Sequence, residues 1–250
     1  MRFGTTSTVQ QSGALAILEA LGDSTPRPPA RFVTVIGPSG QILRSAADGN
    51  LDLVLTHAPA LEERWLSGRW TRRCPFGASR FAIVGPKTDP AHVAGATSAA
   101  DALRRIDRTG AIFVSRGDSS GTHEKELGLW KIAGLHREPG DTYFETGGDQ
   151  TSTLRLADEW GAYALADLPT LAQQKGLALA VLFTGDSVLA NPYTLYAVGS
   201  DSMHTPGVRD SLIDWMLAVW RPRVLSLRLP DGTPAFSPRS PACESASRPT

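Results

Sequence analysis

The sequence has few cysteines, no excess of charge of either sign and no long apolar run. Lys and Arg together number 25, as do Asp and Glu, so the formal net charge is zero. This balance argues against a nucleic acid or an anionic membrane surface as a partner. No apolar run approaches the ~20 residues needed to cross a bilayer, which argues against a membrane-spanning protein.

The two cysteines, Cys74 and Cys243, are too few and too far apart in sequence to indicate a redox compartment. Cys243 lies in the segment 237–250, which is rich in Pro, Ser and Arg, a composition typical of disordered tails. We therefore expect a disordered tail and no structural disulfide. Residues 1–4 contain no apolar signal-peptide segment, so we expect a mature-type chain, a truncated reading frame or a cytoplasmic protein.

Apolar strands and amphipathic helices alternate along the rest of the chain. The patterns predict strands at 31–36, 51–55, 80–84, 112–114, 142–146, 178–183 and 191–198, and helices at 14–21, 60–66, 99–106, 123–133, 152–160, 168–174 and 208–220. This alternation is typical of an α/β fold with largely parallel sheets and flanking helices. A chain of 250 residues can form one or two such domains.

One polar turn between a predicted strand and a predicted helix is the main candidate for a functional site. It reads Ser115-Arg116-Gly117-Asp118-Ser119-Ser120-Gly121-Thr122. N–H groups at a helix start lack intrahelical partners, glycines allow a ligand to approach the backbone, and Arg116 adds a charged guanidinium. Asp118 can pair with Arg116 from within the turn. The turn is therefore a candidate site for a tetrahedral oxyanion, although simple capping of the helix would need the same residue types.

The same turn is also compatible with a serine hydrolase. Gly117-Asp118-Ser119-Ser120-Gly121 fits the G-x-S-x-G nucleophile pattern and has the strand–turn–helix context that this pattern requires. A triad would need His204, because His123 opens the following helix and His136 lies just beyond it. No His-Gly-Gly oxyanion loop precedes the turn. We therefore prefer binding to hydrolysis.

Other donor-rich turns stand at predicted helix starts or strand ends. They are Thr5-Thr6-Ser7-Thr8, Thr56-His57 and Gly147-Gly148-Asp149-Gln150. Ligands of open α/β sheets bind at the carboxyl ends of the strands. Turns so far apart in sequence can converge only if those ends face one cleft, which suits two α/β lobes with a ligand between them.

In their order and spacing, these segments resemble the Tup-type tungstate-binding proteins of bacterial tungstate ABC transporters, from Gly4 to about Pro238. The matching segments are Thr5-Thr6-Ser7-Thr8 with Ser12-Gly13, 52–58, 81–86 with Asp89-Pro90, 113–123 with Glu126-Leu127 and Leu129-Trp130, 143–147, Gly161-Ala162-Tyr163, Asp167, Asn191-Pro192-Tyr193 and Ile213-Asp214-Trp215. The resemblance implies a two-lobed type II periplasmic-binding-protein fold with the ligand in the interlobe cleft. Lobe I would comprise 1–80 and 193–236, and lobe II 81–192.

The resemblance also implies a ligand set and a role. The ligand-binding residues would be Thr6, Ser7, Thr56, Arg116, Ser120 and Thr122, supported by Thr5, Asp118, Ser119, Gly121 and Gly148. The protein would be a monomeric, non-enzymatic binding protein without a cofactor or a coordinated metal cation, located in the periplasm or otherwise outside the cytoplasm. It would deliver its oxyanion to a membrane permease and its ATPase. The chain departs from the family in lacking an export signal, in a first strand cut almost to nothing, and in the 237–250 tail.

The choice of oxyanion depends on protonation. Phosphate keeps a proton near neutral pH and benefits from an acidic acceptor, whereas tungstate and molybdate favour donors alone. The phosphate-binding family has an acidic residue at the end of the third strand, where this chain has Thr56-His57. A carboxylate there would repel a dianion strongly in a low dielectric. We therefore expect tungstate or molybdate, with phosphate and sulfate as alternatives, sulfate being distinguished only by cavity size.

Overall fold

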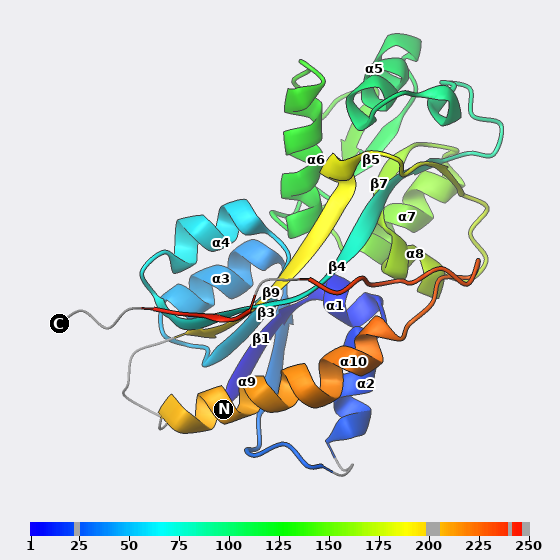
Figure 1. Ribbon diagram of the computed structural model, residues 1–250. Coiled ribbons are helices and arrows are strands. Elements are labelled where there is room, and N and C mark those ends of the chain that lie inside the picture. The colour runs from blue at the N-terminus through cyan, green and yellow to red at the C-terminus, as the bar shows by residue number, and fades with distance from the viewer. Residues whose placement is uncertain (23–25, 199–205, 240–241, 247–250) are drawn as a thin grey trace. The chain divides into compact units, whose positions relative to one another are not determined.

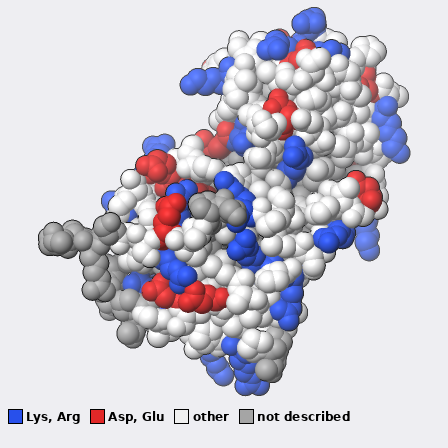
Figure 2. Space-filling model, viewed as in Figure 1, with Lys and Arg blue, Asp and Glu red and all other residues white. Residues whose placement is uncertain are grey.

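The computed structural model describes residues 1–22, 26–198, 206–239 and 242–246. The chain divides into two compact units: unit 1 is Met1–Ala78 with Pro192–Thr250, and unit 2 is Ser79–Asn191. It passes between the units within β4 (Trp70–Gly85) and again within β9 (Ala190–Val198). No helix in the described part of the chain is long and apolar enough to cross a membrane. Basic and acidic side chains are intermixed on the face drawn in Figure 2, in keeping with their equal numbers.

Unit 1 is built on a sheet with the strand order β2-β1-β3-β9-β4-β10. β1 (Arg2–Thr6) pairs in parallel with β2 (Val33–Gly37) and β3 (Leu53–Thr56), and β9 runs antiparallel to β3. The helices of the unit are α1 (Ser7–Gln11), α2 (Ala14–Leu21), α3 (Ser39–Ala47), α4 (Pro59–Leu66), α9 (Pro206–Trp215) and α10 (Arg221–Leu225), and a π-helical stretch, Met216–Trp220, joins the last two.

Alternating side chains on β3 explain why helices cover both faces of the unit 1 sheet. Leu53 and Leu55 are buried in one apolar cluster with residues of α2 and α9, whereas Val54 belongs to a second cluster with α3 and α4. Figure 1 shows these two pairs of helices on opposite sides of the strands. Successive strand residues point to opposite faces, so a buried strand must be apolar throughout.

Unit 2 repeats this arrangement. Its strands are β5 (Phe113–Ser115), β6 (Tyr143–Glu145), β7 (Ala164–Asp167), β8 (Ala180–Phe183) and the end of β4. Its helices are α5 (Ala99–Thr109), α6 (Gly121–Ile132), α7 (Gln150–Glu159) and α8 (Leu168–Gln173). Short 3-10 turns lie at Val93–Gly95 and Ser187–Leu189. β5 pairs in parallel with β6, a parallel bridge joins Phe113 to Tyr163 just before β7, and β4 runs antiparallel between β7 and β8. Neighbouring strands therefore follow the same order in both units: the second strand of the unit, the first, the third, and then a strand that enters from the other unit. This order is β2-β1-β3-β9 in unit 1 and β6-β5-β7-β4 in unit 2. The predicted α/β class with largely parallel strands is confirmed.

The N-terminal segment differs from the expectation of a first strand cut almost to nothing. β1 is a five-residue internal strand of the unit 1 sheet, paired with β2 on one side and β3 on the other. Phe3 is fully buried and packs edge-on against Phe32 and Trp220. Pairing with two neighbouring strands and the packing of Phe3 stabilise β1 although the chain begins only one residue before it. The expectation that the first strand is cut almost to nothing was therefore wrong.

The C-terminal segment also differs from the prediction. Cys74 of β4 forms a disulfide with Cys243, and the adjacent β10 (Glu244–Ser245) pairs antiparallel with β4. Ser237 and Ala78 add a pair of backbone hydrogen bonds at 2.8 and 2.9 Å. The expectation of no disulfide was wrong. The prediction of a disordered tail was also wrong for residues 237–239 and 242–246, which make these contacts. Residues 240–241 and 247–250 lie outside the described residues.

A buried carboxylate fastens the two ends of unit 2 to each other. Asp167, the last residue of β7, accepts hydrogen bonds from the Ser79 hydroxyl and from Asn191 Nδ2, the latter at 3.0 Å. Ser79 and Asn191 are the first and last residues of the unit. Burial raises the pKa of Asp167, while these donors and Thr170 favour its ionised form. The two chain crossings thus share one polar anchor inside unit 2.

Candidate functional site

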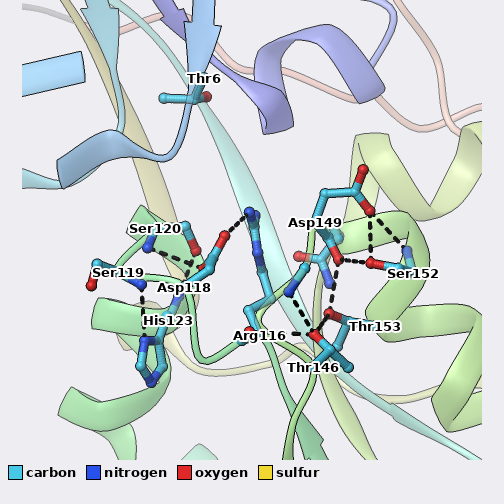
Figure 3. A network of polar contacts seen from close by, with 12 residues as sticks. Thr6, Arg116, Asp118, Ser119, Ser120, His123, Thr146, Asp149, Ser152 and Thr153 are labelled. Atoms are coloured by element: carbon cyan, nitrogen blue, oxygen red, sulfur yellow. Dashed lines mark hydrogen bonds and ion pairs between the residues drawn. The ribbon is translucent and has the colours of Figure 1, made fainter. Parts of the chain in front are cut away.

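Arg116 lies immediately after β5 and is almost completely buried, with 1% of its surface exposed. Its guanidinium pairs with Asp118, whose second carboxylate oxygen accepts the Ser120 backbone N–H at 3.1 Å (Figure 3). The predicted pairing of Arg116 with Asp118 is confirmed. Asp118 therefore holds the guanidinium at the N-terminal end of α6, where backbone N–H groups and the helix dipole favour an anion.

The backbone of this turn explains its glycine. Gly117 has a φ of +60°, and a Cβ there would lie 2.5 Å from Cβ of Glu145. Ser119 also has a positive φ, +57°, which is uncommon for a residue with a side chain. Both residues are needed in this conformation to bring the chain from β5 into α6 around the Arg116–Asp118 pair.

The first turn of α6 supplies hydroxyl groups. Ser120 is the N-cap, and its Oγ accepts the His123 N–H at 3.2 Å. Thr122 is fully buried, and its Oγ1 has no hydrogen-bond partner among the described residues. Most buried polar groups in proteins have such a partner. The Thr122 hydroxyl therefore fits a role as a donor to a bound acceptor such as an oxyanion.

A second turn lies against the first. β6 pairs with β5, so the turn that follows β6 is at the same end of the sheet as Arg116. Thr146 Oγ1 lies 3.3 Å from the carbonyl oxygens of both Ser115 and Arg116, which share its single O–H, and it accepts the Gly148 N–H at 3.2 Å. Figure 3 shows Thr146 beside Arg116. The sequence indicated Gly148 here, but Thr146 was missed, although a hydroxyl residue at a strand end next to two glycines was a usable signal.

The predicted site residues of unit 1 stand at the ends of β1 and β3. Thr5 pairs with Leu55 in the parallel register, so Thr6 and Thr56 follow at the same edge of the sheet. Thr6 caps α1, accepting the Val9 N–H at 3.2 Å, and Ser7 opens that helix. Thr5 donates its hydroxyl to the Leu55 carbonyl at 3.2 Å, which commits this side chain to the sheet.

The Thr56 hydroxyl is bonded to a buried carboxylate that sequence reasoning missed. Thr56 Oγ1 donates to Glu62 Oε1 at 2.8 Å, and Glu62 also accepts from the Ala58 N–H at 3.0 Å and the Tyr196 hydroxyl at 2.9 Å. Glu62 is only 3% exposed, and its burial raises the pKa of its carboxyl group. It lies on α4, six positions after Thr56, so the residues at the strand end alone gave no sign of it.

Unit 2 has a matching arrangement beneath the Arg116 turn. Glu126 accepts from the Ser115 hydroxyl at 2.8 Å, the Tyr143 hydroxyl at 2.6 Å and Trp130 Nε1 at 3.2 Å. Burial raises the pKa of Glu126 to about 7. In both units a hydroxyl at the end of a strand and a tyrosine hydroxyl thus meet on one buried glutamate.

Glutamate 126 should make the stability of the protein depend on pH. Burial places the pKa of Glu126 in the folded state at about 7, above its ordinary value of 4.5, so the folded state binds this proton more tightly than the unfolded state does. This contribution is present below about pH 4.5 and is lost as pH rises through about 7, by roughly 3 kcal/mol. Glu126→Gln cannot ionise, so the variant should lose less stability between pH 4.5 and 8. Urea unfolding at both pH values measures the difference.

The matched control for that experiment is Glu159→Gln, which changes an exposed glutamate at the end of α7 in the same unit. It should follow the wild-type pH dependence. If Glu126→Gln also followed it, the carboxyl group of Glu126 would not be the origin of the effect.

Ser119 does not have the surroundings of a hydrolase nucleophile in the described part of the chain. Its side chain is exposed, and no hydrogen bond there joins its hydroxyl to a histidine ring. His123 Nδ1 instead accepts the backbone N–H of Ser119, at 3.3 Å. His204, the predicted third member of a triad, lies outside the described residues.

Two α/β units of the same strand order, connected by two chain crossings and carrying donor-rich turns at their strand ends, define the class of bilobal solute-binding proteins. A family model described as the PBP superfamily domain matches residues 2–218. The tungstate-binding protein TupA of Peptoclostridium acidaminophilum is 33% identical over 221 residues, covering 86% of this chain and 76% of that protein. The chain therefore belongs to the PBP superfamily, in the family of the TupA tungstate-binding proteins.

Two further similarities agree with this assignment. A putative ABC transporter anion-binding protein of Haloferax volcanii is 36% identical over 206 residues, covering 79% of this chain; the aligned region spans only 59% of that protein. The crystal structure described as the tungstate ABC transporter from Geobacter sulfurreducens superposes with a TM-score of 0.74 at 36% identity, covering 86% of this chain and 93% of that one.

Proposed function

We propose that this protein is the solute-binding component of an ABC importer and that it captures the tungstate oxyanion. The observation that carries the proposal is the α6 start, where a buried guanidinium anchored by Asp118 stands with the buried hydroxyl of Thr122, which has no hydrogen-bond partner among the residues that the structure describes. Such a set of donors suits an anion that carries no proton of its own. The relatives named as tungstate-binding and as an ABC transporter anion-binding protein support the same ligand class and the same transport role.

In this proposal the ligand is held by residues of both units. Unit 2 would contribute Arg116, Ser120 and Thr122, and unit 1 would contribute Thr6, Ser7 and Thr56. The bound oxyanion then provides the contacts that favour a closed arrangement of the units over an open one. Molybdate, of the same shape and charge, would be a second ligand. The protein would act outside the cytoplasm as a monomer, deliver the oxyanion to a membrane permease and its ATPase, and catalyse no reaction.

A thermal-shift series with tungstate, molybdate, sulfate and phosphate tests the choice of ligand. A ligand that binds only the folded state stabilises it by about 4 kcal/mol at a thousandfold excess over Kd. Tungstate should therefore raise the melting temperature by several degrees, whereas phosphate should leave it nearly unchanged. A larger shift with phosphate than with tungstate would overturn the choice of oxyanion.

The hydrolase alternative has its own test. If Ser119 were a nucleophile, a fluorophosphonate probe would label it, and Ser119→Ala would abolish both the labelling and ester hydrolysis. We expect no labelling at Ser119 and tungstate binding by Ser119→Ala within a few-fold of wild type. Labelling that disappears in Ser119→Ala would contradict a purely binding role.

A further inference from the structure

The proposed ligand Thr56 has one hydroxyl proton, and that proton already has an acceptor. Thr56 is fully buried at the end of β3, and its Oγ1 donates to Glu62 Oε1 at 2.8 Å. A threonine hydroxyl has a single O–H, so it cannot donate to an ionised Glu62 and to an oxyanion at the same time. With Glu62 ionised, Thr56 can offer an oxyanion only lone pairs, which repel it. The hydrogen bond between these two side chains therefore opposes the proposed role of Thr56.

Protonation of Glu62 removes this conflict. A neutral carboxylic acid can donate its own proton to Thr56 Oγ1. The Thr56 hydroxyl is then free to donate to the oxyanion, which gives a continuous chain from Glu62 through Thr56 to the ligand. The change requires one proton from solvent, bound by the Glu62 carboxylate; the Glu62–Thr56 hydrogen bond reverses its direction, and no other covalent bond is made or broken.

A cavity in unit 1 gives solvent a route to Glu62. Its volume is about 230 Å³, and its lining includes Glu62 and Tyr196 together with the exposed residues Glu63 and Gly68. The Tyr196 hydroxyl donates to Glu62 Oε2 at 2.9 Å, whereas Thr56 occupies Oε1. One carboxylate oxygen thus serves the Thr56 side and the other the tyrosine of the cavity wall.

Within the described part of the chain, the charges around Glu62 come from α4, β4 and β10. Arg73 of β4 lines the cavity and attracts the ionised carboxylate, although Arg73 also pairs with Glu244 of β10 at 3.4 Å. Glu63, next to Glu62 on α4, adds a negative charge at the cavity. The hydrogen bonds from Thr56, Tyr196 and the Ala58 N–H favour ionisation, and burial opposes it more strongly.

We propose that Glu62 is a positioning residue that couples capture of the oxyanion to uptake of one proton, which enters through the unit 1 cavity and frees the Thr56 hydroxyl to face the ligand. This inference rests on the proposed function, because it takes Thr56 as a ligand. Burial already raises the pKa of Glu62, and a nearby dianion raises it further. Above the pKa of Glu62 in the ligand-free protein, affinity should therefore fall by up to tenfold per pH unit.

Calorimetric titration with tungstate tests the coupling. At one pH, titrations in two buffers with different ionisation enthalpies give the number of protons taken up per tungstate bound. We expect a Kd that rises with pH for the wild type, and proton uptake that approaches one proton where this rise is steepest. Glu62→Gln, which resembles the protonated acid, should show little uptake and a Kd nearly independent of pH, so that it binds more tightly than wild type wherever the wild-type Kd has risen.

Glu63→Gln is the matched control, because it removes the same charge from the neighbouring residue of the same cavity without touching Thr56. It should keep the wild-type uptake. Tyr196→Phe gives a second test that does not require Glu62→Gln to fold: it removes a donor that favours ionised Glu62, so the rise in Kd should begin at a higher pH.

The outcomes separate this inference from the proposed function. Binding of tungstate without proton uptake, or uptake that is unchanged in Glu62→Gln, overturns the coupling through Glu62 and leaves tungstate capture intact; in the second case Glu126 would be the next group to examine. Absence of any tungstate binding by the wild type overturns both.

Discussion

Arg116→Ala should weaken tungstate binding by roughly ten- to a hundredfold. Arg116 is a full positive charge among the proposed ligands, it cannot lose its proton, and it is held in place by Asp118. Hydrogen bonds to charged groups contribute about 1.5–3 kcal/mol each, which corresponds to that range of affinity. Calorimetric titration of the variant with tungstate measures the loss directly.

The same substitution should also lower the stability of the ligand-free protein. Arg116 is buried, and its removal leaves the carboxylate of Asp118 largely buried without the guanidinium, although Asp118 keeps the Ser120 N–H. The titration is therefore done well below the melting temperature of the variant. Arg105→Ala is the matched control, because it removes another arginine of unit 2 that pairs with an aspartate, Asp101, at 3.0 Å but lies on α5 away from the turn.

Two conservative variants divide the contribution of Arg116 into charge and geometry. Arg116→Lys keeps the charge but loses the planar fork, so its affinity should be intermediate. Asp118→Asn keeps the guanidinium but weakens its tether, so the loss should come from misplacement of Arg116. If Arg116→Ala bound tungstate as tightly as wild type, the oxyanion would not be held at this turn.

Much of the fold could be predicted from local sequence patterns. The helix 14–21 was predicted with its structural bounds, because its apolar positions have helical spacing and Gly22 follows it. The Arg116 turn was predicted as a strand–turn–helix connection because the apolar strand, the glycines and the amphipathic helix are adjacent in sequence. Its pairing with Asp118 was predictable for the same reason, since the two residues are separated by one position.

Features that depend on how separate elements pack were not predictable in this way. The first half of β4, from Trp70, contains paired arginines and Pro75, and such residues usually argue against a strand. Glu62 and Glu126 lie on helices after the turns they support, so only the packing of each helix on its sheet brings their carboxylates to Thr56 and Ser115. The position of the buried glutamate behind each turn therefore depends on the fold and cannot be predicted from the local spacing of residues.

The disulfide is the clearest case of a contact that local sequence patterns do not predict. Cys74 and Cys243 are separated by 169 positions, and Cys243 lies in a segment whose composition suggested disorder. Composition measures how much apolar surface a segment can bury, but a covalent bond to a buried strand residue orders a short segment without that surface. Cys74 is fully buried in the unit 1 core, and the bond draws β10 onto β4 beside it.

Cys243→Ser should lower the free energy of unfolding by about 2–5 kcal/mol. A cross-link that closes a loop of this length removes much of the conformational freedom of the unfolded chain, and the entropic model places the effect near the upper end of this range. The substitution leaves the buried Cys74 side chain in the core, so the loss reports on the bond and not on a cavity. Urea unfolding of the variant and of the wild type, each with and without a thiol reductant, measures the change.

The reductant supplies the control within the same experiment. Reduced wild type should unfold at nearly the urea concentration of Cys243→Ser, and the variant itself should not respond to the reductant. Equal stability of the oxidised wild type and the variant would mean that the Cys74–Cys243 bond does not constrain the unfolded chain. In that case β10 would be held on β4 by noncovalent contacts, among them its ladder and the Arg73–Glu244 ion pair, whose side chains are about half exposed.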